Sequence, residues 1–171
     1  METVSIIGVD PSLRHTGVAM VTYNFETNKV NVSNCFVVNT PQKLKGLEAI
    51  KYALVTLEEL ADKEVYDDAK QVVLESPPNV FNPKFPAINF IQCGHIVGGA
   101  ACLFGLERAT FCVPNSWNKR NKEKAHKEFL AKGGDWQSWH FLGKPYKYSM
   151  EHIIDAACIA WWYLEKEYLD A

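Results

Sequence analysis

The sequence lacks the features of a membrane-embedded or secreted protein. No uninterrupted apolar run reaches the ~18 residues that a membrane-spanning helix needs, and the first residues have neither the basic start nor the long apolar run of a signal peptide. The five cysteines are odd in number and form no Cys-x-x-Cys pair, which argues against a disulfide framework and against a structural zinc site. We therefore expect a soluble, cytoplasmic protein with free thiols and no membrane partner.

Glycine and proline are no more frequent than in an average protein, and no glycine-rich phosphate-binding loop is present. The 10 glycines and 8 prolines show no period, so the chain is not collagen-like, and 47% hydrophobic residues exclude a mainly disordered chain. Without a Walker-type or Gly-x-Gly-x-x-Gly loop, we expect no nucleotide cofactor. The length of 171 residues predicts one domain spanning 1–171, which is too short for a two-domain sugar kinase of the actin-like type.

The order of apolar runs and helical patterns predicts an α/β domain. Short links between the first three strands favour an antiparallel meander, and crossover helices make the last two strands parallel. Right-handed crossovers place the strand at 71–75 beside the strand at 4–9, in a five-stranded mixed sheet flanked by helices. Thr40-Pro41 is typical of a helix start. We expect strands at 4–9, 17–23, 30–38, 71–75 and 108–113, and helices at 40–60, 87–104, 122–131 and 149–168.

Acidic residues stand at the ends of the two strands that we expect to be central. Asp10 ends the first apolar strand and Glu75 ends the fourth. Because the carboxyl ends of adjacent parallel strands meet at one edge of a sheet, which is the usual place for a site in α/β proteins, both carboxylates are expected there. Asp155 lies in a strongly apolar run of the last helix, and His152 shares its face three residues earlier. The pattern predicts one site built from these four residues.

A group of acids at one point favours divalent-metal chemistry. Converging carboxylates repel one another, and a bound cation offsets that repulsion. Oxygen ligands suit Mg²⁺ or Mn²⁺, and two such ions about 3.5–4 Å apart promote phosphodiester hydrolysis. Each residue taken alone also has a structural interpretation: Asp10 as a turn residue before proline, Glu75 as a solvated strand end, Asp155 as part of a network at the helix start. His152 is either a ligand or general base, or a polar residue of the first helical turn.

Three stretches resemble the motifs of the RuvC-like Holliday junction resolvases. They are residues 6–19 (IIGVDPSLRHTGVA), 72–75 (VVLE) and 152–157 (HIIDAA). The likeness extends in order and spacing over nearly the whole chain. It implies the RNase H-like fold and a Mg²⁺-dependent endonuclease that acts as a homodimer and makes paired nicks across a four-way DNA junction.

The resemblance also implies roles for individual residues. Asp10, Glu75 and Asp155 would be catalytic ligands of two Mg²⁺ ions, for which Mn²⁺ would substitute. His152 would be the fourth ligand, because family members carry either aspartate or histidine at this position. Ser12 stands where the family usually has glycine, so the turn after Asp10 is expected to differ slightly.

A basic, aromatic-rich segment is concealed by the net charge of -2. Residues 117–147 carry eight basic and three acidic side chains, a net charge of +5, against -7 for the rest of the chain. Lysine and arginine neutralise phosphates and aromatic rings stack on bases, so the segment predicts a DNA-binding surface; the other interpretation is a solvated helix with core aromatics. Phe81 is the candidate for the aromatic that the family stacks at the opened junction, with Phe85 and Phe90 nearby. The predicted DNA contacts are Phe81, Lys119, Arg120, Lys122 and Lys124.

The leading hypothesis is a structure-selective DNA endonuclease that cleaves Holliday or other branched junctions in recombination, repair or the processing of replication intermediates. The alternative resembles the RNase H-like nucleases that trim structured ribosomal RNA precursors, which share a similar first motif and final aspartate. The acid at position 75 fits the resolvases better. A junction-binding protein without activity is disfavoured by the retained acids. The small residues of helix 87–104 permit close packing either onto the sheet or across a two-fold axis.

Overall fold

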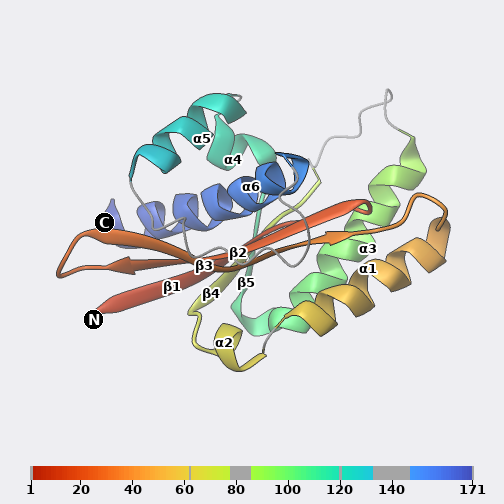
Figure 1. Ribbon diagram of the computed structural model, residues 1–171, viewed down its shortest axis with the longest axis horizontal. Helices are drawn as coiled ribbons and strands as arrows, with labels where there is room; N and C mark the ends of the chain where they lie inside the picture. The colour runs from red at the N-terminus through yellow and green to blue at the C-terminus, as the bar shows by residue number, and fades with distance from the viewer. Residues whose placement is uncertain (1, 62, 78–85, 120, 133–146, 171) are drawn as a thin grey trace.

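A five-stranded mixed sheet forms the centre of the computed structural model, which describes residues 2–61, 63–77, 86–119, 121–132 and 147–170 (Figure 1). The strand order is β3-β2-β1-β4-β5. Strands β1 to β3 pair antiparallel, whereas β1 with β4 and β4 with β5 pair parallel, which confirms the predicted sheet. The strands are β1 (Thr3–Asp10), β2 (His15–Asn24), β3 (Lys29–Asn39), β4 (Gln71–Glu75) and β5 (Ala109–Cys112).

The register brings the carboxyl ends of β1 and β4 to one edge of the sheet. Val9 of β1 pairs with Leu74 of β4, one residue before the end of each strand. Asp10 and Glu75 are the final residues of these two strands. Parallel pairing therefore places the two acids at the same edge, as expected from the sequence.

Helices cover both faces of the sheet. Helices α1 (Gly46–Leu60) and α3 (Ala87–Phe104) pack on one face, and α6 (Lys147–Leu164) packs on the other (Figure 1). Ile6 of β1 contributes to the core on the α6 side and Ile7 to the core beneath α1 and α3, so β1 is buried on both faces. The remaining helical elements are α2 (Lys63–Asp67), a 3₁₀ turn (Leu106–Arg108), α4 (Pro114–Asn118), α5 (Lys122–Ala131) and a π-helical turn (Glu165–Leu169).

Helix α1 begins later than the sequence predicts. The amide of Thr40 donates to the carbonyl of Arg14 at 2.9 Å, so the chain is still paired with the β1–β2 connection at this point. The Arg14 guanidinium also donates to the carbonyls of Pro41 and Leu44, at 2.8 and 3.1 Å. These contacts hold the segment as a turn, and the first helical residue is Gly46. The predicted helix start at Thr40-Pro41 is therefore wrong.

Helix α3 is the one helix of the described chain that is long and apolar enough to cross a membrane, with 18 residues and a mean hydropathy of 1.4. The sequence contains no uninterrupted apolar run of this length because polar residues such as Gln92 and His95 divide it. Length and composition do not separate a membrane span from the core helix of a soluble protein. In this fold α3 packs against α1, where Leu54 lies beside Gly99.

Candidate functional site

Two glycines hold helix α6 close to the sheet. A Cβ atom on Gly8 of β1 would lie 1.8 Å from the carbonyl oxygen of Ala156, and one on Gly17 of β2 would lie 2.2 Å from that of His152. Only a residue without a side chain permits these approaches. They bring the first turns of α6 to the edge of the sheet where β1 ends in Asp10.

Asp10, His152 and Asp155 form a compact group of candidate ligands. Within the described residues, one ligand atom from each lies within 4.8 Å of the other two. Nδ1 of His152 is 3.0 Å from Oδ2 of Asp10. Burial raises the pKa of Asp10; the hydrogen bond with His152 opposes this shift and the charge of Asp155 reinforces it. The pKa of His152 is also raised, first by its hydrogen bond with Asp10.

Glu75 lies near this group but is not part of it. The indole N–H of Trp117, on α4, donates to Oε2 of Glu75. Burial raises the pKa of Glu75 to about 7, the charges of Asp10 and Asp155 add to this shift, and the hydrogen bond from Trp117 opposes it. Burial and the neighbouring acids therefore favour the protonated form of Glu75.

The raised pKa of Glu75 predicts a loss of stability at alkaline pH. Because the folded-state pKa of about 7 exceeds the ordinary 4.5, the contribution of Glu75 is fully present below pH 4.5 and is lost as the pH rises through 7. Glu75→Gln stays neutral and keeps an oxygen for Trp117, so it escapes this loss. We expect it to be more stable than the parent at pH 8 by about 3 kcal/mol, with little difference at pH 4.

Urea unfolding in the presence of EDTA, at pH 4 and pH 8, measures this difference. Glu59→Gln is the matched control, because Glu59 is an exposed residue of α1 and its substitution changes the formal charge equally. If parent and Glu75→Gln follow the same pH dependence of the free energy of unfolding, the raised pKa of Glu75 is contradicted.

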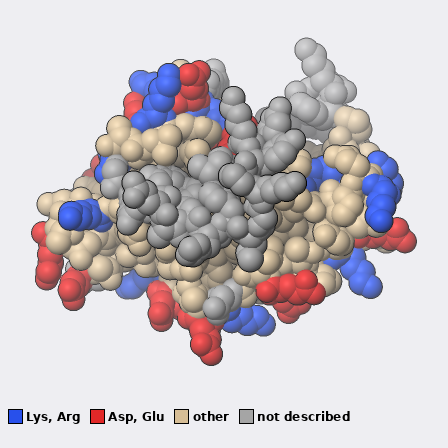
Figure 2. Space-filling model, in the orientation of Figure 1, with Lys and Arg blue, Asp and Glu red and all other residues tan. Residues whose placement is uncertain are grey.

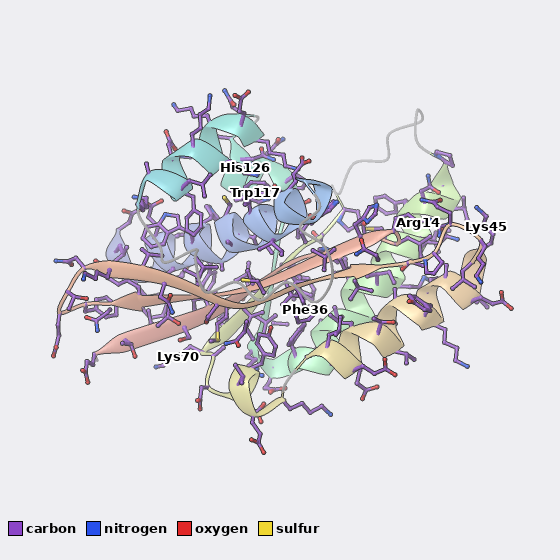
Figure 3. All side chains as sticks on the ribbon, viewed as in Figure 1. Arg14, Phe36, Lys45, Lys70, Trp117 and His126 are labelled. Atoms are coloured by element: carbon purple, nitrogen blue, oxygen red, sulfur yellow. The ribbon has the colours of Figure 1, made fainter. Side chains whose placement is uncertain are left out.

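Asp155 is 3% exposed, and both of its carboxylate oxygens contact helix α5. Nζ of Lys122 is 2.5 Å from Oδ2, and Nε2 of His126 is 2.6 Å from Oδ1. The rings of His126 and Trp117 stack, with centroids 6.3 Å apart and planes 9° apart, and Figure 3 places both beside α6. Helices α4 and α5 thus hold the acids: Trp117 binds Glu75, while Lys122 and His126 bind Asp155.

Trp117 and His126 were not predicted as site residues. Trp117 belongs to a helix of five residues, which is too short to give a periodic signal. Its start is nevertheless marked by Pro114 at the first helical position. His126 follows Lys122 by four residues, so the two share one face of α5. This four-residue spacing in a basic segment could have indicated that His126 lies on the same side of α5 as Lys122.

His15, which follows the turn after Asp10, adds a third histidine to the surroundings of the acids. The ring of His15 stacks on that of His152 with centroids 5.0 Å apart, and its Nδ1 is 3.0 Å from Oδ1 of Asn39. Ser12 closes the turn: its hydroxyl donates to the carbonyl of His15 at 2.6 Å. The serine is therefore accommodated by hydrogen bonding within the turn.

The other predicted DNA contacts are divided between the α4–α5 surface and undescribed positions. Lys119 ends α4 in the left-handed conformation (φ 45°), and Lys124 is exposed on α5, 3.6 Å from Oε1 of Glu128. Both lysines line a groove of about 720 Å³ between α5 and α6. Basic and acidic atoms lie side by side over α5 in Figure 2. Phe81 and Arg120 lie outside the described residues.

Comparison with known proteins gives matches among solved structures only. No family model and no curated protein sequence matches the chain. RuvC of T. thermophilus, solved with a Holliday junction substrate, is 16% identical with a TM-score of 0.65, and the match covers 96% of each chain. The yeast mitochondrial Holliday junction resolvase Ydc2 is 15% identical with a TM-score of 0.60, covering 96% of this chain and 81% of that one. The fowlpox virus Holliday junction resolvase is 14% identical with a TM-score of 0.52, covering 95% and 99%.

The chain has the RNase H-like resolvase fold. The predicted fold class is thereby confirmed. In this resolvase fold the edge formed by β1 and β4 carries two carboxylates and an imidazole whose ligand atoms are close together, with Glu75 nearby. This donor set fits a hard divalent cation such as Mg²⁺ or Mn²⁺. Within the described part of the chain, Asp155 alone of these residues has both ligand oxygens in contact with other side chains, Lys122 and His126.

Proposed function

We propose that the protein is a Mg²⁺-dependent endonuclease that cleaves four-way and other branched DNA junctions, a crossover junction endodeoxyribonuclease. The observation that carries the proposal is the gathering of Asp10, His152 and Asp155 at the edge formed by β1 and β4, in a chain with the resolvase fold. The solved structures of T. thermophilus RuvC and of the fowlpox virus resolvase include complexes with Holliday junction DNA. Branched DNA is therefore the first substrate to test.

Some residues of the site would bind cations, and others orient the residues that bind them. Asp10, Glu75 and Asp155, with His152, would hold two Mg²⁺ ions, for which Mn²⁺ substitutes. Bound cations of this kind activate a water molecule and stabilise the leaving oxygen of a phosphodiester. Trp117 fixes the orientation of Glu75 through its indole N–H, and the hydrogen bond between His152 and Asp10 fixes both side chains.

The α4–α5 surface supports binding of the DNA backbone. Lys124 and Lys127 are more than two-thirds exposed on α5, and among the described residues they pair with exposed glutamates of the same helix. Such surface pairs contribute little to stability, so these lysines can leave their glutamates and bind DNA phosphates with little loss of folding free energy. Lys119 adds a further cation at the end of α4.

A cleavage assay with matched substrates tests the proposal. We expect nicking of a synthetic four-way junction in Mg²⁺ or Mn²⁺, weaker nicking of flaps, and none of linear duplex, RNA–DNA hybrid or structured RNA. EDTA is expected to stop the reaction, and added Mg²⁺ to restore it. Preferred cleavage of structured RNA would favour the ribosomal RNA trimming alternative instead, and no cleavage of any substrate in either metal would contradict a nuclease.

We also propose that the protein forms a homodimer through helix α3. The first turns of this helix expose the apolar side chains of Ile88, Phe90 and Ile91, with 55%, 42% and 53% of their surface exposed. Gly94 and Gly98 continue the same helix with open space beside them, whereas Gly99 contacts Leu54 of α1. Exposed apolar side chains beside small residues are suited to close packing across a two-fold axis.

Sedimentation velocity tests the homodimer. The parent is expected to sediment as a dimer at micromolar concentration and Ile91→Glu as a monomer, because the substitution places a charge within the apolar surface of α3. Leu106→Glu is the control, since Leu106 is 61% exposed outside α3. A parent that remains monomeric, even with junction DNA bound, would rule out the dimer.

A further inference from the structure

Lys122 differs from the other lysines of helix α5 in the acid that it contacts. Lys124 and Lys127 pair with glutamates whose side chains are 65% and 80% exposed. Lys122 instead contacts Asp155, whose side chain is only 4% exposed, at 2.5 Å. It also lies 3.0 Å from Oε1 of the half-exposed Glu151, one turn earlier on α6. Lys122 is therefore the cation that balances the buried acid of the site.

The same ammonium remains within reach of a bound nucleic acid. The side chain of Lys122 is 41% exposed, and it is the first residue of α5, directly after the segment that carries Lys119. Burial alone would lower the pKa of Lys122, but its contacts with Asp155 and Glu151 raise it, so the group is a permanent cation at neutral pH. A phosphate arriving at α5 thus meets an ammonium whose other partner is a carboxylate of the site.

We propose that Lys122 is a positioning residue that exchanges between Asp155 and a DNA phosphate, and thereby couples metal binding to DNA binding. In the free protein Lys122 occupies Oδ2 of Asp155, an oxygen that a divalent cation requires. When DNA binds, a phosphate draws the ammonium away and leaves this oxygen to the cation. The inference rests on the proposed nuclease function and adds a means by which the metal site is completed only when substrate is present.

Electrostatics explains why one side chain is sufficient for this coupling. An ammonium and a divalent cation on the same carboxylate oxygen would repel each other at close range in a poorly solvated site. His126 contacts the other oxygen, Oδ1, so Lys122 is the side chain that occupies Oδ2. Linkage is reciprocal: if DNA strengthens metal binding by some factor, metal strengthens DNA binding by the same factor.

Metal affinity in the absence of DNA tests the first part of the proposal. Mn²⁺ binding is followed by the loss of the electron paramagnetic resonance signal of free Mn²⁺. We expect Lys122→Met and Lys122→Gln to bind Mn²⁺ at least tenfold more tightly than the parent. Lys127→Met removes the same charge from the same helix and is expected to change the affinity less than twofold, because Lys127 is exposed and pairs with the exposed Glu123 rather than with an acid of the site.

The outcomes separate this inference from the proposed function. Equal or weaker Mn²⁺ binding by the Lys122 variants, with a normal parent, overturns the exchange of Lys122 but leaves the nuclease intact. Failure of the parent and of every variant to bind Mn²⁺ overturns the metal site itself, and the inference with it. Because a purely structural lysine would weaken the site on removal, tighter metal binding is a result that only competition for Asp155 predicts.

A second measurement tests the coupling. Junction affinity is measured by fluorescence anisotropy in EDTA and in Ca²⁺, with the integrity of the DNA checked on the same samples. In the parent and in Lys127→Met, Ca²⁺ is expected to tighten junction binding at least fivefold. In Lys122→Met the factor is expected to fall below twofold, since Asp155 is then free of its ammonium with or without DNA. An unchanged factor in Lys122→Met would overturn the coupling.

Discussion

Asp10→Asn is expected to reduce junction cleavage by about a thousandfold or more while junction binding stays within a few-fold of the parent. Asparagine keeps the shape of the side chain and an oxygen for the hydrogen bond with His152, but it removes the charge that the cations require. Binding is expected to survive because the proposed phosphate contacts are lysines at the end of α4 and on α5 rather than the acids. Gel analysis of nicked products and anisotropy of labelled junctions measure the two effects separately.

Thermal unfolding separates this loss from misfolding. Burial raises the pKa of Asp10, so the charged carboxylate destabilises the metal-free fold, and the neutral variant is expected to melt at or above the temperature of the parent in EDTA. Mg²⁺ is expected to raise the melting temperature of the parent but not that of Asp10→Asn. Asp68→Asn, an exposed change before β4, serves as the control. Full cleavage by Asp10→Asn would contradict the metal site.

The part of the site that depends on sheet topology could be predicted from sequence. A nearly continuous apolar run identified β1 as a strand buried on both faces, and a similar run identified β4. Both strands are apolar enough to be central and crossover connections are right-handed, so the two strands were expected as parallel neighbours with their terminal acids, Asp10 and Glu75, at one edge. For these two residues, the place at the end of a strand was therefore sufficient to predict that they lie close together.

Contacts between elements that are not neighbours in the sheet could not be predicted in this way. Trp117 binds Glu75 across 42 positions of sequence, and His126 binds Asp155 across 29. Both depend on how α4 and α5 lie on α6, which neither charge nor periodicity specifies. Lys122 illustrates the limit: its charge indicated a phosphate contact, but only the structure reveals its carboxylate partner.

The position of α6 depends most directly on Gly17 and Gly8. Since a Cβ on Gly17 would lie 2.2 Å from a backbone oxygen of His152, alanine cannot be accommodated by rotating a side chain, and the helix itself has to move. Gly17→Ala is therefore expected to displace His152 from Asp10, to lose most cleavage, and to destabilise the fold by about 3 kcal/mol. Gly8→Ala, at 1.8 Å from the carbonyl oxygen of Ala156, is expected to be at least as damaging.

Gly94→Ala provides the matched control for these substitutions, because a Cβ there meets no atom of the described residues within 4 Å and the residue lies inside helix α3. Alanine favours the helix over glycine, so this variant is expected to gain about 0.5–1 kcal/mol of stability. Because Gly94 lies on the proposed dimer surface of α3, its cleavage is compared with that of the parent at equal dimer content. Urea unfolding and junction cleavage are measured on all three variants. They show whether the damage comes from the close approach of α6 to β1 and β2 or from substitution of any glycine. If Gly17→Ala unfolds and cleaves as the parent does, α6 is not held against the sheet at this distance. The positions of His152 and Asp155 would then need another cause, because both reach Asp10 only through the packing of that helix.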